Sequence, residues 1–214
     1  MVILKEKDRE FVKSKFIKEL QGDVKIIYFT QDFECEYCFE TGELLKELSS
    51  LSERLNIEIF DFEREREQAK RWNVDKIPAT MLFGKREYGI RFFGVPSGYE
   101  FVTLIEDIVD VSRGASRLSP STKEALKDIK KPVHIQVFVT PTCPYCPRAV
   151  RIAHQMAIES EYVVADMIEV IEFPQLANKY AVMAVPKVVI NDKVSFEGAL
   201  PEQQFLHYIL HAIE

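Results

Sequence analysis

The chain has 214 residues, 47% of them hydrophobic and 29% charged, and its formal net charge is −6. This acidic balance argues against nucleic acids and anionic membranes as partners, because long-range attraction would draw neither of them to the protein. The apolar start at residues 1–4 runs straight into charged residues and is too short for a signal peptide or a membrane span, so we expect a soluble, cytoplasmic protein.

The first half of the chain alternates predicted strands and helices around one Cys-x-x-Cys motif. A run of β-branched and aromatic residues at 24–29 predicts a strand that ends shortly before Cys35, and leucines along residues 44–51 predict a helix after Cys38. The other elements predicted here are a helix at 6–20, a strand at 57–62, a short helix at 64–72, a hairpin opening at 79–83 and a helix at 99–111.

The second half repeats this arrangement around a second motif. A strand predicted at 133–139 ends shortly before Cys143, and apolar residues along 150–157 predict a helix after Cys146. The other elements are a helix at 120–129 with Ser119 as its N-cap, a strand at 162–165, a short helix at 174–180, a hairpin opening at 187–190 and a helix that opens at Pro201. The order strand, helix, strand, helix, hairpin, helix is therefore present twice.

The spacing of the motifs also repeats. Pro78 follows Cys35 by 43 residues, and Pro186 follows Cys143 by the same 43 residues. A repeat on this scale predicts two similar units, at residues 1–117 and 118–214. The link at 114–118 is too short to act as a free linker, so we expect the units to pack against each other.

All four cysteines of the chain belong to the two motifs. A thiol at a helix N-terminus is stabilised as a thiolate, and a second thiol one turn later can attack a mixed disulfide. We therefore expect Cys35 and Cys143 at the helix starts as nucleophiles, with Cys38 and Cys146 as resolving thiols.

Zinc binding is the structural alternative for these cysteines, since two Cys-x-x-Cys pairs can supply four thiolates. The two pairs lie about 105 positions apart, however, whereas zinc ribbons place theirs roughly 15–20 apart. We expect no metal site as the main role.

An apolar-Pro dipeptide follows each motif at the same distance. A cis X-Pro bond costs only about 0.5–1 kcal/mol and would leave the preceding backbone groups free to pair with an extended substrate segment. Ordinary trans prolines that open a strand are the alternative. A tyrosine also fills the same slot in both motifs, where it either shapes access to the sulfurs or is a simple surface aromatic. The substrate-binding residues predicted on this basis are Ile77, Pro78, Val185, Pro186, Tyr37 and Tyr145.

These features together resemble a known family. A strand, a Cys-x-x-Cys at a helix start and an apolar-Pro before a hairpin are similar to the thioredoxin fold, and Cys143-Pro144-Tyr145-Cys146 is the motif of glutaredoxins. Two such units in a chain of this length resemble the protein disulfide oxidoreductases of thermophilic archaea and bacteria, which are glutaredoxin-like relatives of protein disulfide isomerase.

The resemblance implies an α/β fold of two tandem thioredoxin-like units, each with a central mixed β-sheet flanked by helices, packed together. It also implies a cytosolic enzyme that reduces, forms or isomerises disulfides of protein substrates. Its redox-active disulfides would need no further cofactor, and a thioredoxin-reductase-like flavoprotein would be the expected partner.

Two other functions stay open. An electron-relay domain of a flavoprotein peroxide-reductase system has a similar paired module, but that module keeps only one Cys-x-x-Cys, which counts against it here. A peptide-binding chaperone with secondary cysteines is the third possibility, and it would bind peptides after replacement of all four cysteines.

The two sites are not expected to be equivalent. Glu36 places a negative charge inside the first motif and opposes thiolate formation, whereas Pro144 stiffens the second motif and Arg148 favours its anion. We therefore expect the second site to be the stronger oxidant, unless solvent screening erases the effect of Glu36. Thioredoxins carry a buried carboxylate six residues before the first cysteine, where this chain has Phe29 and Val137, and the sequence indicates no substitute base.

Two further residues and two strands carry expectations that depend on tertiary structure. Trp72 is expected to be a packing or surface residue, and His154 a surface or interface residue. Predicted edge strands at 90–92 and 194–196 can pair between units or between chains, and the sequence does not choose between the two.

Overall fold

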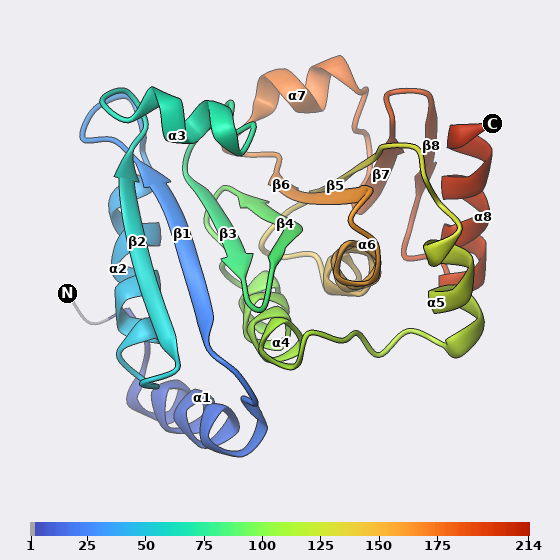
Figure 1. The fold of residues 1–214 in the computed structure, drawn as a ribbon. Coiled ribbons are helices and arrows are strands. Elements are labelled where there is room, and N and C mark those ends of the chain that lie inside the picture. The colour runs from blue at the N-terminus through green and yellow to red at the C-terminus, as the bar shows by residue number, and fades with distance from the viewer. Residues whose placement is uncertain (1–2) are drawn as a thin grey trace.

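The computed structural model describes residues 3–214 and contains one eight-stranded mixed sheet in the order β2-β1-β3-β4-β6-β5-β7-β8 (Figure 1). The strands are β1 (Val24–Thr30), β2 (Leu55–Asp61), β3 (Ala79–Phe83), β4 (Glu87–Phe93), β5 (Val133–Val139), β6 (Val163–Glu169), β7 (Lys187–Ile190) and β8 (Val194–Glu197).

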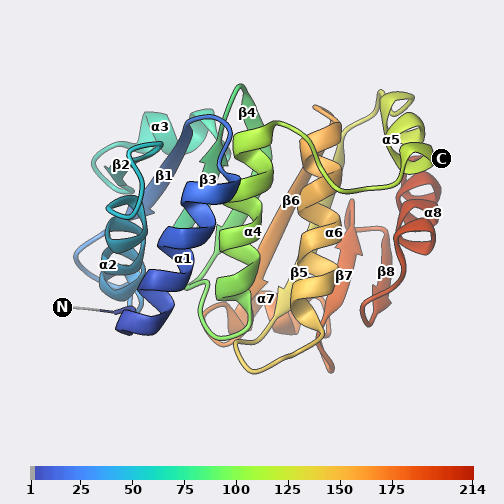
Figure 2. The same cartoon turned by 90° about the horizontal axis from the view of Figure 1, so that it is seen from below.

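Helices cover both faces of this sheet. Four of them, α1, α2, α4 and α6, lie on one face, α3 and α7 lie on the other, and α5 and α8 close the end beside β7 and β8 (Figures 1 and 2). The helices are α1 (Glu6–Glu19), α2 (Cys38–Ser49), α3 (Arg66–Arg71), α4 (Glu100–Arg113), α5 (Pro120–Lys127), α6 (Cys146–Glu159), α7 (Pro174–Lys179) and α8 (Glu202–Ile213).

The same topology is present in both halves. β1, α2, β2, α3, β3, β4 and α4 in the first half correspond in order to β5, α6, β6, α7, β7, β8 and α8 in the second. The local strand orders, β2-β1-β3-β4 and β6-β5-β7-β8, also correspond. The prediction of two packed units with helix-flanked mixed sheets is confirmed, with the addition that the two sheets form one.

Most predicted elements lie within a few residues of the observed ones. Ser119 caps α5 as expected, since the Thr122 N–H donates to its hydroxyl oxygen. Pro201 is not the first helical residue, because its extended backbone makes it the N-cap of α8, which begins at Glu202.

The two halves are joined by the parallel pairing of β4 with β6, with Ile90 opposite Ala165 and Phe93 opposite Ile168. The strand predicted at 90–92 therefore pairs between the units. β8, which contains the other predicted edge strand, is one edge strand of the sheet, and β2 is the other.

A buried ion pair spans this junction. Arg91 on β4 lies opposite Asp166 on β6 and binds its carboxylate with two nitrogens, Nε to Oδ1 at 2.6 Å and Nη2 to Oδ2 at 2.9 Å. His134 Nε2 lies 2.7 Å from the same Oδ2. Burial alone would raise the pKa of Asp166, but Arg91 and His134 hold it well below its ordinary value.

A second polar cluster lies between α4 and α6 on the helical face. Arg151 pairs with Asp107 and Asp110, and His154 Nδ1 lies 2.6 Å from Asp107 Oδ2. His154 is fully buried, so it is an interface residue and the surface alternative is wrong. Its apolar helix neighbours did not distinguish a buried contact between helices from an exposed one.

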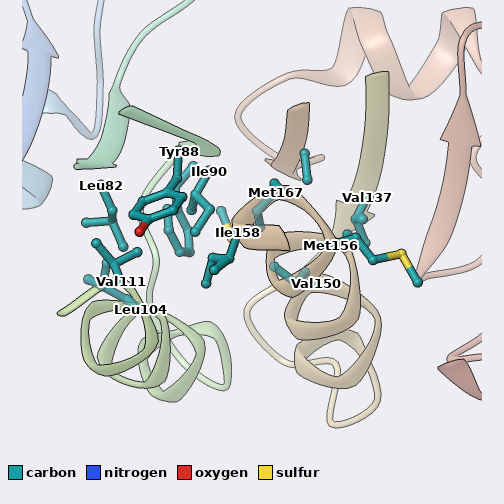
Figure 3. Packing of buried hydrophobic residues seen from close by; sticks show 14 of the residues in the cluster. Leu82, Tyr88, Ile90, Leu104, Val111, Val137, Val150, Met156, Ile158 and Met167 are labelled. Carbon is teal, nitrogen blue, oxygen red and sulfur yellow. The ribbon is translucent and has the colours of Figure 1, made fainter. Parts of the chain in front are cut away.

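One apolar cluster continues from the first half into the second under these helices. Leu82 on β3 and Ile90 on β4 face Leu104 on α4, and Met167 on β6 faces α6 (Figure 3). The opposite face of the sheet has its own cluster, in which Trp72 packs between aromatic rings of the first half. The expectation of a packing role for Trp72 is confirmed.

Replacement of Arg91 tests the junction. Arg91→Met leaves the buried Asp166 carboxylate without its main partner, so the free energy of unfolding should fall by about 3–5 kcal/mol. Arg91→Met combined with Asp166→Leu should recover more than half of this loss, because no buried charge is then left unpaired. Denaturant unfolding monitored by circular dichroism measures both.

The matched control is Lys70→Met, which breaks an exposed pair with Glu67 and should cost about 0.5 kcal/mol or less. A loss for Arg91→Met no larger than that of the control would contradict a stabilising role for the pair.

Candidate functional site

Both Cys-x-x-Cys motifs lie at the same edge of the sheet, the one formed by the carboxyl ends of β1 and β5. The pairings that lead from β1 to β5 comprise two antiparallel and two parallel steps, so β1 and β5 run in the same direction and end at one edge. Phe29 pairs with Ala79, and Phe138 pairs with Lys187. The start of each hairpin therefore lies beside the end of the strand that leads to its motif, which brings proline and cysteines together.

Each motif forms a disulfide, Cys35–Cys38 in the first half and Cys143–Cys146 in the second. α2 and α6 begin at Cys38 and Cys146, so the expectation that the first cysteine occupies the helix start is wrong. The first cysteine lies in the turn before the helix. The helix still acts on it in the second motif, where the Cys146 N–H donates to Cys143 Sγ at 3.1 Å.

The two motifs differ in this contact and in exposure. Within residues 3–214, no amide donates to Cys35 Sγ as one does to Cys143. Cys35 is half-buried and Cys143 is buried, while Cys38 and Cys146 are the less exposed member of each pair, at 2% and 0%.

Both apolar-Pro bonds are cis, Ile77–Pro78 and Val185–Pro186, which confirms the conformation expected from their spacing. Ile77 and Pro78 line a cavity of about 250 Å³ together with Cys35. In the second half, the Val185 carbonyl oxygen lies 3.7 Å from Cys143 Sγ. The structure thus brings each predicted dipeptide to its own motif.

The two motif tyrosines have different surroundings. Tyr37 is half-buried and lines the first cavity, whereas Tyr145 is 70% exposed. Glu36, its neighbour in the motif, raises the pKa of Tyr37, followed by the effect of burial. Tyr37 therefore forms part of the wall beside Cys35, whereas Tyr145 lies exposed in the second motif.

The strand residues before the motifs carry no carboxylate. Phe29 and Val137 are fully buried apolar side chains. Tyr28, next to Phe29, donates its hydroxyl to the Cys38 carbonyl oxygen at 2.5 Å, and burial raises its pKa to about 12. It therefore supports the motif as a neutral donor.

Acidic side chains lie near the first site that were not predicted from the sequence. Glu172 follows β6 in the second half, yet it lines the cavity that contains Cys35. Burial raises its pKa to about 7, and the nearby carboxylates of Glu169, Glu40 and Glu36 act in the same direction. In the sequence, the only indication of a role for Glu172 is its position shortly after a predicted strand, which both motifs share. This position points to the first site only once β6 is known to lie beside β4.

A second buried acid lies at the start of α4. Glu100 is 1% exposed, and burial raises its pKa to about 7. Its Oε2 accepts a hydrogen bond from the Thr103 hydroxyl at 2.6 Å, while Oε1 has no hydrogen-bond partner among residues 3–214. Glu100 was not among the residues predicted from the sequence either.

The described part of the chain contains neither a candidate metal centre nor a candidate membrane span. Among residues 3–214, no group of three or more His, Cys, Asp and Glu side chains is arranged to hold a metal ion, and all four thiols are in disulfides. Nor does any helix in that range have the length and apolar character needed to cross a membrane.

Comparison with known proteins finds similarity to thioredoxin-fold redox proteins. A family model described as a thioredoxin domain matches residues 133–211. The F subunit of the alkyl hydroperoxide reductase of Staphylococcus aureus (strain Mu50 / ATCC 700699) is 28% identical over 167 residues, which are 78% of this chain and 30% of that protein. The chain therefore spans about a third of the length of the curated relatives it matches.

Solved structures match over nearly the whole chain. The N-terminal NTD_N/C domain of the alkyl hydroperoxide reductase AhpF of Enterococcus faecalis has a TM-score of 0.89, with 24% identity over 96% of this chain and 99% of that one, and shows the shared fold. A protein disulfide oxidoreductase from Aeropyrum pernix K1 has a TM-score of 0.91 and 32% identity, covering 98% of this chain and 93% of that one. At this identity and coverage, the chain belongs to the protein disulfide oxidoreductase family.

Proposed function

We propose that the protein catalyses dithiol–disulfide exchange on protein substrates through two redox sites, one in each half. The observation that carries this proposal is the presence, twice at one sheet edge, of a Cys-x-x-Cys disulfide beside a cis-proline. Depending on the redox state of its partner, such a pair reduces, forms or isomerises disulfides.

Cys35 and Cys143 act as the nucleophiles in this proposal. The thiolate of Cys35 attacks a substrate disulfide, the substrate S–S bond breaks, and one substrate thiolate leaves as the mixed disulfide forms. The Cys38 thiolate then attacks Cys35 Sγ, which closes the internal disulfide and releases the second substrate thiolate. Burial of Cys38 and Cys146 supports this order, because a shielded thiol meets the mixed disulfide before it meets another substrate.

Substrate binding is assigned to the residues around the sulfurs. Ile77, Pro78 and Tyr37 wall the first site, and Val185 and Pro186 lie at the second. Exposed apolar side chains flank both sites in the sequence, and exposed apolar groups of this kind suit contact with an unfolded or extended partner. They are Phe33, Phe39, Tyr145 and Met183.

A flavoprotein of the thioredoxin-reductase type is the proposed electron donor. Support comes from the similarity to the F subunit of alkyl hydroperoxide reductase. The same similarity favours a second candidate function, in which this chain relays electrons within a peroxide-reductase system. The two intact motifs and the near-complete match to the Aeropyrum pernix protein favour the first function.

Further details of the proposal concern the setting of the enzyme. We place the boundary of its two units between residues 117 and 118, in the connection between α4 and α5. We also propose a cytoplasmic location, a relationship to protein disulfide isomerase, a thermophilic source and no cofactor besides the disulfides. Disulfide chemistry in a cytosol is characteristic of hyperthermophiles, which supports the cytoplasmic location and the thermophilic source together.

Replacement of the nucleophiles tests the function. Cys35→Ser and Cys143→Ser should each lose part of the insulin-reducing and scrambled-ribonuclease-refolding activity, with the larger loss for Cys143→Ser. The double variant should lose roughly 100-fold or more, because no nucleophile is left.

The control is a protein with all four cysteines replaced by serine. If peptide binding survives in that protein without any loss of function, a peptide-binding chaperone replaces the proposed enzyme. Inactive wild-type protein that retains zinc after purification would restore the metal alternative.

The two sites should differ in reduction potential. The Cys146 N–H stabilises a thiolate at Cys143, whereas Glu36 opposes one at Cys35, so the reduced form of the second site is the more stable. We expect its potential to be higher by about 30 mV, a tenfold change in equilibrium constant.

Variants that retain one motif each allow this measurement. Cys35→Ser/Cys38→Ser and Cys143→Ser/Cys146→Ser are equilibrated in glutathione buffers and scored by thiol alkylation. Equal potentials, or a higher potential at the first site, would contradict the expected asymmetry.

A further inference from the structure

The loop after β6 belongs to the second half of the chain but forms a wall of the first redox site. Its course is fixed where the Val170 N–H donates to the Val139 carbonyl at 3.0 Å. From there Ile171, Glu172 and Pro174 line the cavity of about 250 Å³ that contains Cys35 and Pro78. Cys35 also lines a cavity of about 260 Å³ formed by first-half residues, so the cavity with Glu172 is the one of its two neighbouring spaces that both halves share.

The Glu172 carboxylate is held in place within this wall. Its Oε1 accepts the Val95 N–H at 2.6 Å, and its own N–H donates to Glu169 Oε2 at 2.8 Å. The approach of Glu172 to the first half needs a glycine at position 94, which has φ +97° and whose N–H binds the Pro78 carbonyl at 3.0 Å. A Cβ at Gly94 would lie 2.7 Å from Glu172 Oε1. The carboxylate thus binds the N–H of Val95, and the N–H of the preceding residue, Gly94, binds the cis-proline Pro78.

The groups that act on Glu172 favour its protonated form near neutral pH. Burial raises its pKa to about 7, the hydrogen bond from Val95 opposes this, and the carboxylates of Glu169 on β6, Glu40 on α2 and Glu36 in the motif raise it further. Tyr28 and Tyr37 also interact with the charge of Glu172, and the pKa of each is raised. Glu172 can therefore both accept and donate a proton at neutral pH.

We propose that Glu172 is the proton-transfer residue of the first redox site, supplied across the junction by the second half. In this step its carboxylate takes the proton of the Cys35 thiol. The resulting thiolate forms a bond to one sulfur of the substrate disulfide, the substrate S–S bond breaks, and the departing thiolate takes the proton from Glu172. Atoms and charge balance without a further reactant, and the carboxylate is ready for another cycle. This inference rests on the proposed function.

The test uses Cys143→Ser/Cys146→Ser as the parent, in which only the first site reacts. Addition of Glu172→Gln should lower the rate of disulfide exchange at pH 7 by about 10-fold or more. The loss should shrink toward pH 9, where the Cys35 thiol ionises without help. Glu172→Asp should restore part of the rate, and thermal unfolding establishes that each variant is folded.

The iodoacetamide reaction of Cys35 separates proton transfer from simple charge repulsion. If Glu172 acted only as a negative charge, Glu172→Gln would lower the pKa of Cys35 and speed both alkylation and exchange at pH 7, which would overturn the proposal. Glu40→Gln is the matched charge control, since it removes a neighbouring carboxylate from exposed surface and should not slow exchange.

Three further outcomes distinguish the role of Glu172 from the proposed function. An active parent whose rate and pH profile are unchanged by Glu172→Gln would overturn the role of Glu172 and leave the proposed function intact. A parent that is inactive at every pH would contradict the function of the first site, and the role of Glu172 with it. Glu172→Gln in Cys35→Ser/Cys38→Ser should leave second-site exchange unchanged, and an equal loss there would also overturn the local role.

Discussion

The parallel pairing of β4 with β6 is the constraint on which the rest of the structure depends. It makes one sheet of two halves and places the carboxyl ends of β1, β4, β6 and β5 at one edge. The placement of the two motifs relative to each other, and of the loop with Glu172 beside the first one, follows from that single register. The buried bidentate contact of Arg91 with Asp166 fixes the register, because a one-residue slip would bury two unpaired charges.

Local patterns in the sequence were sufficient for the elements but not for their assembly. Period-two strands, apolar helix stripes and the repeated 43-residue spacing predicted the order of elements and the cis-prolines. Which edge strand joins the halves was undetermined, because residues 90–92 and 194–196 offer similar unpaired backbone groups. For the same reason the contact of His154 with Asp107, and that of Glu172 with Val95, could not be predicted. Each joins residues from different halves.

The duplicated sites differ because their surroundings are not duplicated. The motif helices begin at equivalent cysteines, yet among the described residues Cys143 is the only cysteine whose Sγ accepts an amide hydrogen bond. The first motif lies instead among carboxylates, two of which come from the second half, Glu169 at the end of β6 and Glu172 in the loop after it. A neighbour contributed by the other half therefore distinguishes two sites whose local folds are nearly the same.

Contacts at the junction run in both directions. While Glu172 reaches the first site, the loop after β4 reaches the turn before the second motif, where the Tyr99 N–H donates to the Pro141 carbonyl at 3.0 Å. Gly98 is required there, since a Cβ would lie 2.2 Å from that carbonyl oxygen, and its φ of +60° suits glycine. The second half thus contributes Glu172 to the first site, and the first half contributes Gly98 and Tyr99 to the support of the turn before the second motif. The chain contains two copies of the redox motif, but each redox site depends on residues from both halves of the joined sheet.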